Sequence, residues 1–198
     1  IRDSENVAYV NGRGKSERIY IDDFTLLGTL TYLALPTFSD EAYQVAVASE
    51  WAQQQLLPGA VNILTNGKHR GVFQMVLPSP GDTLRLPLGQ DSRVRCSRKR
   101  LVDLCSSSVL GGSRKTTQSF ELVVENQYNR SIEVITKDRI PVTKSKDIEV
   151  DAVELNGGQL DPISGIVTWN QTLAPLETRT VVVTYTISFP KGHELQGL

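Results

Sequence analysis

The sequence has very few of the residues that most often carry catalysis or bind metals. Its 198 residues include two histidines, two cysteines and one methionine. A structural or catalytic zinc site needs several His, Cys or carboxylate ligands at close spacing, and neither His69 nor His193 has such neighbours. No serine lies in a G-x-S-x-G motif, and no cysteine has a nearby histidine that could act as its base. We therefore predict no metal, no cofactor and no enzymatic activity.

Long apolar runs and an excess of charge of one sign are also missing. The longest strongly apolar stretch, residues 181–189, is interrupted by two threonines and a serine, and it is far shorter than the roughly 20 residues that span a bilayer. We expect no transmembrane segment in this chain. A formal net charge of -1 gives no reason to expect nucleic acid as a partner. Since the chain begins with Ile1, we expect a processed product, and a preceding signal peptide or domain stays open.

The two cysteines, Cys96 and Cys105, lie nine positions apart with no Gly, Pro or Asn between them. The simplest interpretation is one long strand through Arg93, Leu101 and Leu104, in which the two thiols would be roughly 30 Å apart on opposite faces. No disulfide spans that distance, so we predict two unpaired thiols. A helical turn or a hairpin that brings them together remains the alternative.

Alternation of apolar and polar residues with period two recurs along the chain, and turn signals separate the runs. The clearest case is the last strand, where one face is apolar and the other carries Thr184, Thr186 and Ser188. We expect the following side chains to be buried: Phe120, Leu122, Val124, Ile132, Val134, Val167, Trp169, Val181, Val183, Tyr185, Ile187 and Phe189. The run before this strand is joined to it by a hairpin turn at residues 174–177.

These patterns predict an all-β fold, an antiparallel β-sandwich in which a C-terminal sandwich of immunoglobulin-like size packs with an upstream β region. The predicted divisions are a loosely ordered or helical N-terminal extension (1–29), an N-terminal β region (30–116), a C-terminal β-sandwich (117–190) and a tail (191–198). A single continuous domain over residues 30–190 is the alternative.

Three upstream stretches carry more specific predictions. Asn66-Gly67 is the strongest hairpin signal in the chain. Residues 39–59 combine helix-forming composition with strand alternation, and we favour a strand to about Ser49 followed by a turn. We expect residues 82–97 to form two strands broken at 88–91, and residues 106–119 to be a mobile connection.

One local feature suggests binding. A basic stretch comprises Arg93, Arg95, Arg98, Lys99 and Arg100. Clustered guanidinium groups bind carboxylates and phosphates well, so the stretch could meet an acidic polysaccharide, a phospholipid surface or an acidic partner. The alternative is that these charges protect an edge strand from aggregation. We favour the edge interpretation.

Four stretches in order resemble one known family. They are "QLLPGAVNILTNGKHRGV", "LRLPLGQDSRVRC", "FELVVENQYNRSIEVITKDRIPVTKSKDIEV" and "SGIVTWNQTLAPLETRTVVVTYTISFP". Together they resemble the C-terminal domain of unknown function in mucoidy-inhibitor-A-like proteins, over about residues 30–190. The resemblance implies a β-rich domain that follows a smaller domain and a coiled coil in a bacterial envelope protein, periplasmic or surface-exposed. It also implies a link to exopolysaccharide production, and it supplies no catalytic residues.

The leading functional hypothesis is therefore a non-enzymatic interaction or assembly module of a cell-envelope protein. We expect its partner to be another protein or a second copy of the chain. The alternative is a carbohydrate- or polyanion-binding module, for which Trp51, Tyr43 and Tyr128 are the candidate aromatic residues. A hydrolase is disfavoured, because a nucleophile and metal ligands are missing.

Overall fold

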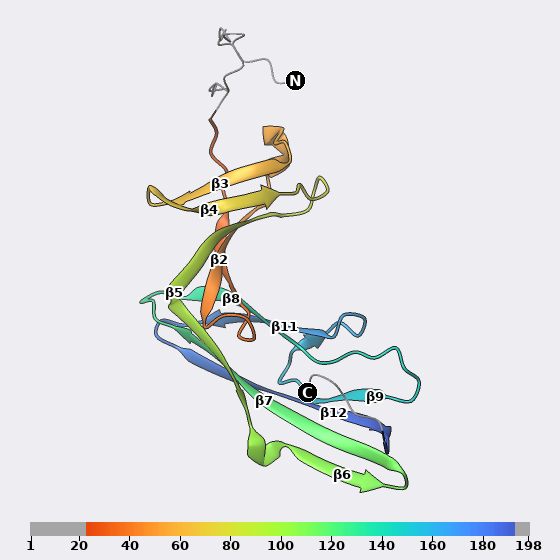
Figure 1. The fold of residues 1–198 in the computed structure, drawn as a ribbon. Helices are drawn as coiled ribbons and strands as arrows, with labels where there is room; N and C mark the ends of the chain where they lie inside the picture. The colour runs from red at the N-terminus through yellow and green to blue at the C-terminus, as the bar shows by residue number, and fades with distance from the viewer. Residues whose placement is uncertain (1–22, 193–198) are drawn as a thin grey trace, which may run out of the picture.

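The structure is a computed structural model that describes residues 23–192, and its elements are almost all strands (Figure 1). Two short 3-10 helices, η1 (Trp51–Gln54) and η2 (Val102–Leu104), accompany the strands. The strands are β1 (Thr29–Ala34), β2 (Glu41–Ala48), β3 (Gly59–Thr65), β4 (Lys68–Met75), β5 (Leu84–Arg100), β6 (Ser106–Leu110), β7 (Ser113–Asn126), β8 (Ile132–Arg139), β9 (Glu149–Glu154), β10 (Gln159–Leu160), β11 (Ile166–Leu173) and β12 (Thr178–Pro190).

Most strands belong to one sheet, which runs in the order β10-β11-β8-β1-β2-β5-β7-β12-β9, with β6 also paired to β7. The all-β prediction is confirmed. The pairing is largely antiparallel, as predicted, with one departure, because β1 pairs with β8 in parallel. About 100 residues separate these two strands in sequence, so the connection is long enough for a parallel crossover. The sheet is therefore mixed.

The sheet folds over on itself, so that two layers enclose an apolar core. The 17-residue strand β5 links the layers, because its first part pairs with β2 and its last part pairs with β7. Inward side chains of β7 and β12 contact those of β11, with Val183 and Val167 fully buried beside Trp169. A second core, where β5 crosses between the layers, contains Tyr32, Ala34, Ala42, Val94, Cys96, Val124, Ile132, Val134 and Leu173.

The predicted alternation in the last strand is largely correct. Val183 and Tyr185 are buried in β12, whereas Thr184 is more exposed, as predicted. Thr186 is the exception, since it is buried although it was assigned to the exposed face. β12 is paired on both sides, with Thr117 of β7 and Asp151 of β9 opposite Thr186, and neighbours on both flanks cover a short side chain.

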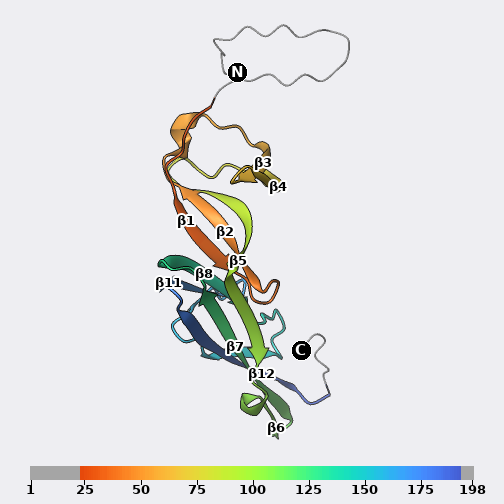
Figure 2. The ribbon, with the colours of Figure 1, turned by 90° about the vertical axis from the view of Figure 1, so that its left-hand side faces the viewer.

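A hairpin arm projects from one end of the molecule, away from the two-layer body (Figure 2). It consists of β3, β4 and η1, and β3–β4 form a separate two-stranded sheet. The predicted turn is confirmed, because Asn66 and Gly67 adopt positive φ angles of 51° and 74° at the tip. The arm has its own small core of Trp51, Met75 and Leu84, and the Trp51 indole donates a hydrogen bond to the carbonyl of Asp82 at 2.8 Å.

The ambiguous segment after residue 39 forms a strand, β2, followed by the 3-10 turn η1, as favoured from the sequence. Two other upstream predictions are wrong. Residues 84–100 form one continuous strand and not two. The pairing of β5 with β2 shifts register next to Gln44 and next to Glu41, and such bulges let a strand continue through residues that resemble a turn. Residues 106–119 are ordered as the hairpin of β6 with β7, which turns at Gly111-Gly112.

Cys96 and Cys105 are both unpaired, although the stretch between them is not the single strand that was expected. β5 ends at Arg100, and η2 follows it. Burial raises the pKa of the Cys96 thiol to about 11, and this thiol donates a hydrogen bond to the carbonyl of Ser39. Cys96 is therefore held as a neutral core residue.

The predicted domain divisions remain a prediction. The sheet itself continues across residue 116, because β7 spans this position and pairs with β5. β1 likewise pairs with β8 from the later part of the chain. Most of the predicted N-terminal extension and of the tail lies outside the described residues.

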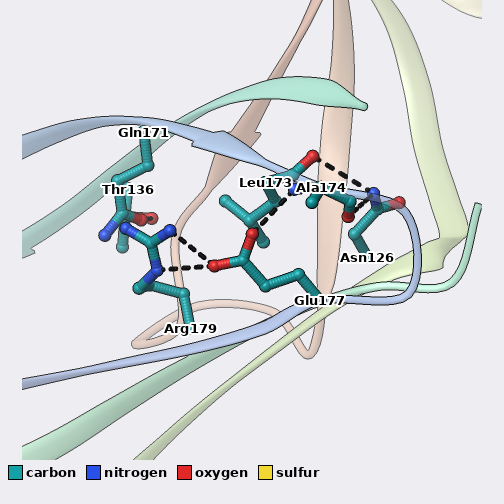
Figure 3. Close-up of polar contacts among 7 residues, drawn as sticks. All are labelled: Asn126, Thr136, Gln171, Leu173, Ala174, Glu177 and Arg179. Atoms are coloured by element: carbon teal, nitrogen blue, oxygen red, sulfur yellow. Dashed lines mark hydrogen bonds and ion pairs between the residues drawn. The ribbon is translucent and has the colours of Figure 1, made fainter. Parts of the chain in front are cut away.

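The hairpin turn between β11 and β12 is held by one buried side chain, Asn126 (Figure 3). Its amide nitrogen donates to the carbonyls of Arg130 at 2.9 Å and Ala174 at 2.7 Å, and more weakly to that of Leu173 at 3.4 Å. The carboxylate of Glu177 accepts the backbone N–H of Ala174 at 2.7 Å from within the same turn. One side chain thus joins the end of β7 to two separate turns.

Candidate functional site

Part of the predicted basic stretch lines an open hollow of about 540 Å³ between the two layers. We call this cavity the arginine hollow. Three arginines from two facing strands contribute to it, Arg98 and Arg100 from β5 and Arg139 from the end of β8. The full lining is Arg98, Arg100, Gln118, Phe120, Arg139, Ile140, Pro141, Val142 and Tyr185.

Arg98 has a structural role in this hollow. Its Nε donates to the buried carboxylate of Asp138 at 3.1 Å, and its guanidinium carbon lies 3.4 Å from the centroid of the Phe120 ring. Thr37 donates a further hydrogen bond to the other oxygen of Asp138 at 2.8 Å. Asp138 therefore balances the charge of Arg98, and the pair links β5 to β8 across the layers.

Arg100 and Arg139 remain as the unbalanced charges of the hollow. Both are exposed, and within residues 23–192 neither forms an ion pair. Arg139 uses only its Nε, which donates to the carbonyl of Ser164 at 3.0 Å, so its terminal nitrogens are available. Two guanidinium groups with free donors favour a carboxylate or another oxyanion as a ligand.

Two nearly buried polar side chains also line the hollow, namely Tyr185 at 5% exposure and Gln118 at 6% exposure. They lie opposite each other on β12 and β7. Among the described residues, the Tyr185 hydroxyl and the Gln118 amide nitrogen have no hydrogen-bond partner. Neither atom is one of the fully buried unpaired atoms of the described region, so both reach the solvent of the hollow and are available to a bound molecule.

The structure places the other members of the predicted basic stretch elsewhere. Arg95 lies 3.8 Å from the Asp40 carboxylate, and Lys99 is exposed on the face of β5 that does not line the hollow. Arg93 stacks over the Tyr128 ring, with its guanidinium carbon 4.1 Å from the centroid. The five residues are thus split between separate surfaces.

Arg93 and Tyr128 line a second, mostly polar hollow of about 450 Å³ near the tip of the arm. The Tyr128 hydroxyl forms a short hydrogen bond to the Asp91 carboxylate, and burial together with this bond raises the pKa of Tyr128 well above its usual value. The ring is stacked by Arg93 and by Arg130, whose guanidinium also donates to the hydroxyl of Tyr32 at 3.2 Å. Tyr128, Arg93 and Arg130 are thus engaged with neighbouring groups of the protein.

The edge-strand interpretation of the basic stretch has a structural basis at one position. Residues 97–100 of β5 pair with β7 on one side, whereas no strand of the described region pairs with them on the other. Charges at such an open edge disfavour strand addition. Lys99 fits this role, because it is exposed and lies outside both hollows.

The aromatic candidates do not form an exposed platform. Trp51 is buried in the arm, and Tyr128 is engaged as described. Tyr43 lies on β2 and is half-buried. An exposed Trp51 would have favoured carbohydrate stacking, and its burial removes that candidate.

Sequence reasoning missed the three polar residues that line the arginine hollow from outside the basic stretch, Gln118, Arg139 and Tyr185. Arg139 stands alone in the sequence, between Asp138 and Ile140, so no cluster marks it. Tyr185 was correctly assigned to the core, but its free hydroxyl depends on which groups face it. These residues come together only because the two layers of the sheet pack against each other.

The chain can be placed among known proteins by comparison. The family described as "Domain of unknown function (DUF4139)" matches residues 13–191. The chain belongs to the DUF4139 family. Protein F37C4.5 of Caenorhabditis elegans is 22% identical over 210 residues, which cover 96% of this chain and 36% of that protein. This DUF4139 chain therefore spans about a third of the length of that curated relative.

Within residues 23–192, no three His, Cys, Asp or Glu side chains lie close enough to hold a metal ion. In the same part of the chain, no helix has the length and apolar character needed to span a bilayer.

Proposed function

We propose that this DUF4139 chain is a non-enzymatic assembly module, and that the hairpin arm is its contact surface. The observation that carries the proposal is the outward face of the arm. Leu64 is 62% exposed and Val72 is 65% exposed there, and the pairing of β3 with β4 makes them diagonal neighbours. Exposed apolar side chains that cluster on one sheet face are typical of protein contact sites.

The open edges of the arm support the same proposal. β3 and β4 pair only with each other among the described strands, so each has an unpaired edge. Such edges accept an additional strand. The occupant that we propose is a second copy of this chain, because an identical edge can pair antiparallel across a twofold axis, and twofold dimers are the commonest assemblies.

Sedimentation velocity over a range of protein concentrations tests this proposal. We expect reversible dimer formation by the wild type. The double variant Leu64→Lys/Val72→Lys should stay monomeric, because like charges then face each other across the contact. A matched control is Val153→Lys, which changes a 61% exposed valine on β9 of the body and should dimerise normally.

A wild type that stays monomeric at every concentration would contradict the proposal of self-assembly. Capture of a different protein by the arm, with the same loss in the double variant, would also overturn the choice of a second copy. Equal dimerisation of wild type and double variant would place the contact elsewhere.

The cellular setting is also a proposal. The sequence resemblance to mucoidy-inhibitor-A-like proteins suggests a place in the bacterial cell envelope, with a link to exopolysaccharide production. Membership of the DUF4139 family is compatible with this setting, although the nematode relative belongs to an organism without such an envelope. Fractionation of a bacterium that expresses the full-length protein tests the setting, and recovery from the cytoplasm alone would contradict it.

A further inference from the structure

The arginine hollow has features that the proposed assembly role does not use. It lies in the body, whereas the proposed contact surface is on the arm. Three arginines line its wall. The carboxylate of Asp138 neutralises the charge of Arg98, so the guanidinium groups of Arg100 and Arg139 remain available. The wall also carries the Tyr185 hydroxyl and the Gln118 amide nitrogen, which have no hydrogen-bond partner among the described residues and belong to residues that are more than nine-tenths buried.

The chemistry of these groups specifies the ligand. The planar forks of two arginines bind a carboxylate through paired, charge-assisted hydrogen bonds. A phenol hydroxyl and an amide suit the hydroxyl groups of a polyol, since each can donate a hydrogen bond and also accept one. The hollow volume of about 540 Å³ lies within the range of small-ligand sites and accommodates one or two sugar rings.

We propose that the arginine hollow binds a carboxylated sugar, that is, a uronic acid unit, alone or within an acidic polysaccharide. The carboxylate contacts Arg100 and Arg139. The ring hydroxyls contact Tyr185 and Gln118. Arg98 does not bind the ligand directly, because its Nε contacts Asp138 and its face contacts Phe120; it positions the wall of the hollow.

The basic residues on the same strand provide a matched control. Arg95 and Lys99 belong to β5, as Arg100 does, yet neither lines the hollow. If diffuse positive charge held the ligand, removing Arg95 and Lys99 would weaken its binding as much as removing Arg100 and Arg139. A ligand held in the hollow responds only to the loss of Arg100 and Arg139.

Isothermal titration calorimetry with an oligouronate of four residues, in low salt, tests the proposal. We expect saturable binding that weakens as salt is added, and no competition by glucose. The double variant Arg100→Gln/Arg139→Gln should bind at least tenfold more weakly. The control Arg95→Gln/Lys99→Gln should stay within about twofold of the wild type. Both variants should keep the wild-type melting temperature, because these side chains are exposed.

Tyr185→Phe provides a second readout inside the hollow. It removes only the hydroxyl, which has no partner in the described region, so folding should be unchanged. We expect about fivefold weaker binding of the oligouronate, since one hydrogen bond to the ligand is lost.

Several results would overturn the proposal. One is the absence of saturable binding by the wild type, and another is an equal loss of affinity in the control variant. Binding of inorganic phosphate or of oligoglutamate as tightly as the oligouronate would exclude a sugar-specific site. These results are independent of the sedimentation test, because none of the substitutions lies on the arm.

Discussion

The body and the arm of this molecule are both built from β-strands, but they differ in how much apolar surface each strand buries. In the body, inward side chains such as Val183 and Leu122 are fully removed from solvent between two layers. In the arm, the buried core consists of Trp51, Met75 and Leu84, and the opposite face of β3–β4 is open to solvent. Because apolar burial is the main stabilising contribution, the body should dominate stability while the arm remains locally weak and available for contact.

The largest expected effect comes from a charge in the body core. Val183→Asp places a carboxylate in the apolar core of the body, and we expect a loss of several kcal/mol, enough to unfold the whole chain. Chemical denaturation monitored by circular dichroism measures this. Val153→Asp, on an exposed position of β9, is the control and should leave the denaturation midpoint nearly unchanged. A normal midpoint for Val183→Asp would refute the core assignment.

Asn126→Ala should give the next largest effect, a loss of about 3 kcal/mol, because the substitution leaves several turn carbonyls without their donor. The control is Gln127→Ala, which removes an exposed side chain that donates one hydrogen bond within the described region, to Glu125. Equilibrium urea unfolding distinguishes the two variants. Equal stability of both would show that the turns do not depend on the buried amide.

The arm should respond locally to the loss of its own core. Met75→Ala should cost about 2 kcal/mol within the arm, at the lower end for a buried methionine because the arm core is small. We expect faster proteolysis at residues 52–58 and 66–71, with the thermal transition of the body unchanged. If Met75→Ala instead lowers the melting temperature of the body, arm and body unfold as one unit. That result would contradict the comparison of the two regions.

The smallest effect concerns pH. The backbone N–H of Ala174 and the guanidinium of Arg179 hold the pKa of Glu177 below its ordinary value of 4.5. A lowered pKa contributes stability that is fully present above pH 4.5 and is lost as the pH falls through the folded-state pKa. Glu177→Gln should therefore flatten the acid limb of the stability profile slightly. Identical profiles of variant and wild type below pH 4.5 would contradict the assigned role.

The sequence predicted features that depend on near neighbours. The turn at Asn66-Gly67 and the alternation of β12 follow from residues within a few positions. The turn is confirmed, and the alternation is confirmed except at Thr186. The break predicted at residues 88–91 was wrong, because a bulged strand and a turn share the same residue types. The mobile connection predicted at residues 106–119 was wrong for a similar reason, since Gly111-Gly112 marks a tight turn as readily as a flexible linker.

The site was only partly predictable, for a different reason. Arg98 and Arg100 belong to the predicted stretch, but alternation along β5 separates them from Lys99. Arg139 joins them from a strand about 40 positions away, through contacts between layers that no local pattern encodes. The basic stretch was therefore visible in sequence, while its division into a hollow and an edge was not.

Hydrogen exchange at low and high protein concentration tests the comparison of body and arm most directly. We predict that backbone amides of the β3–β4 ladder exchange through openings of lower free energy than those of β7–β12 at low concentration. At high concentration, protection should rise in the arm alone, because a second copy covers it. Arm amides as well protected as body amides at low concentration, or a protection pattern that does not change with concentration, would contradict this account.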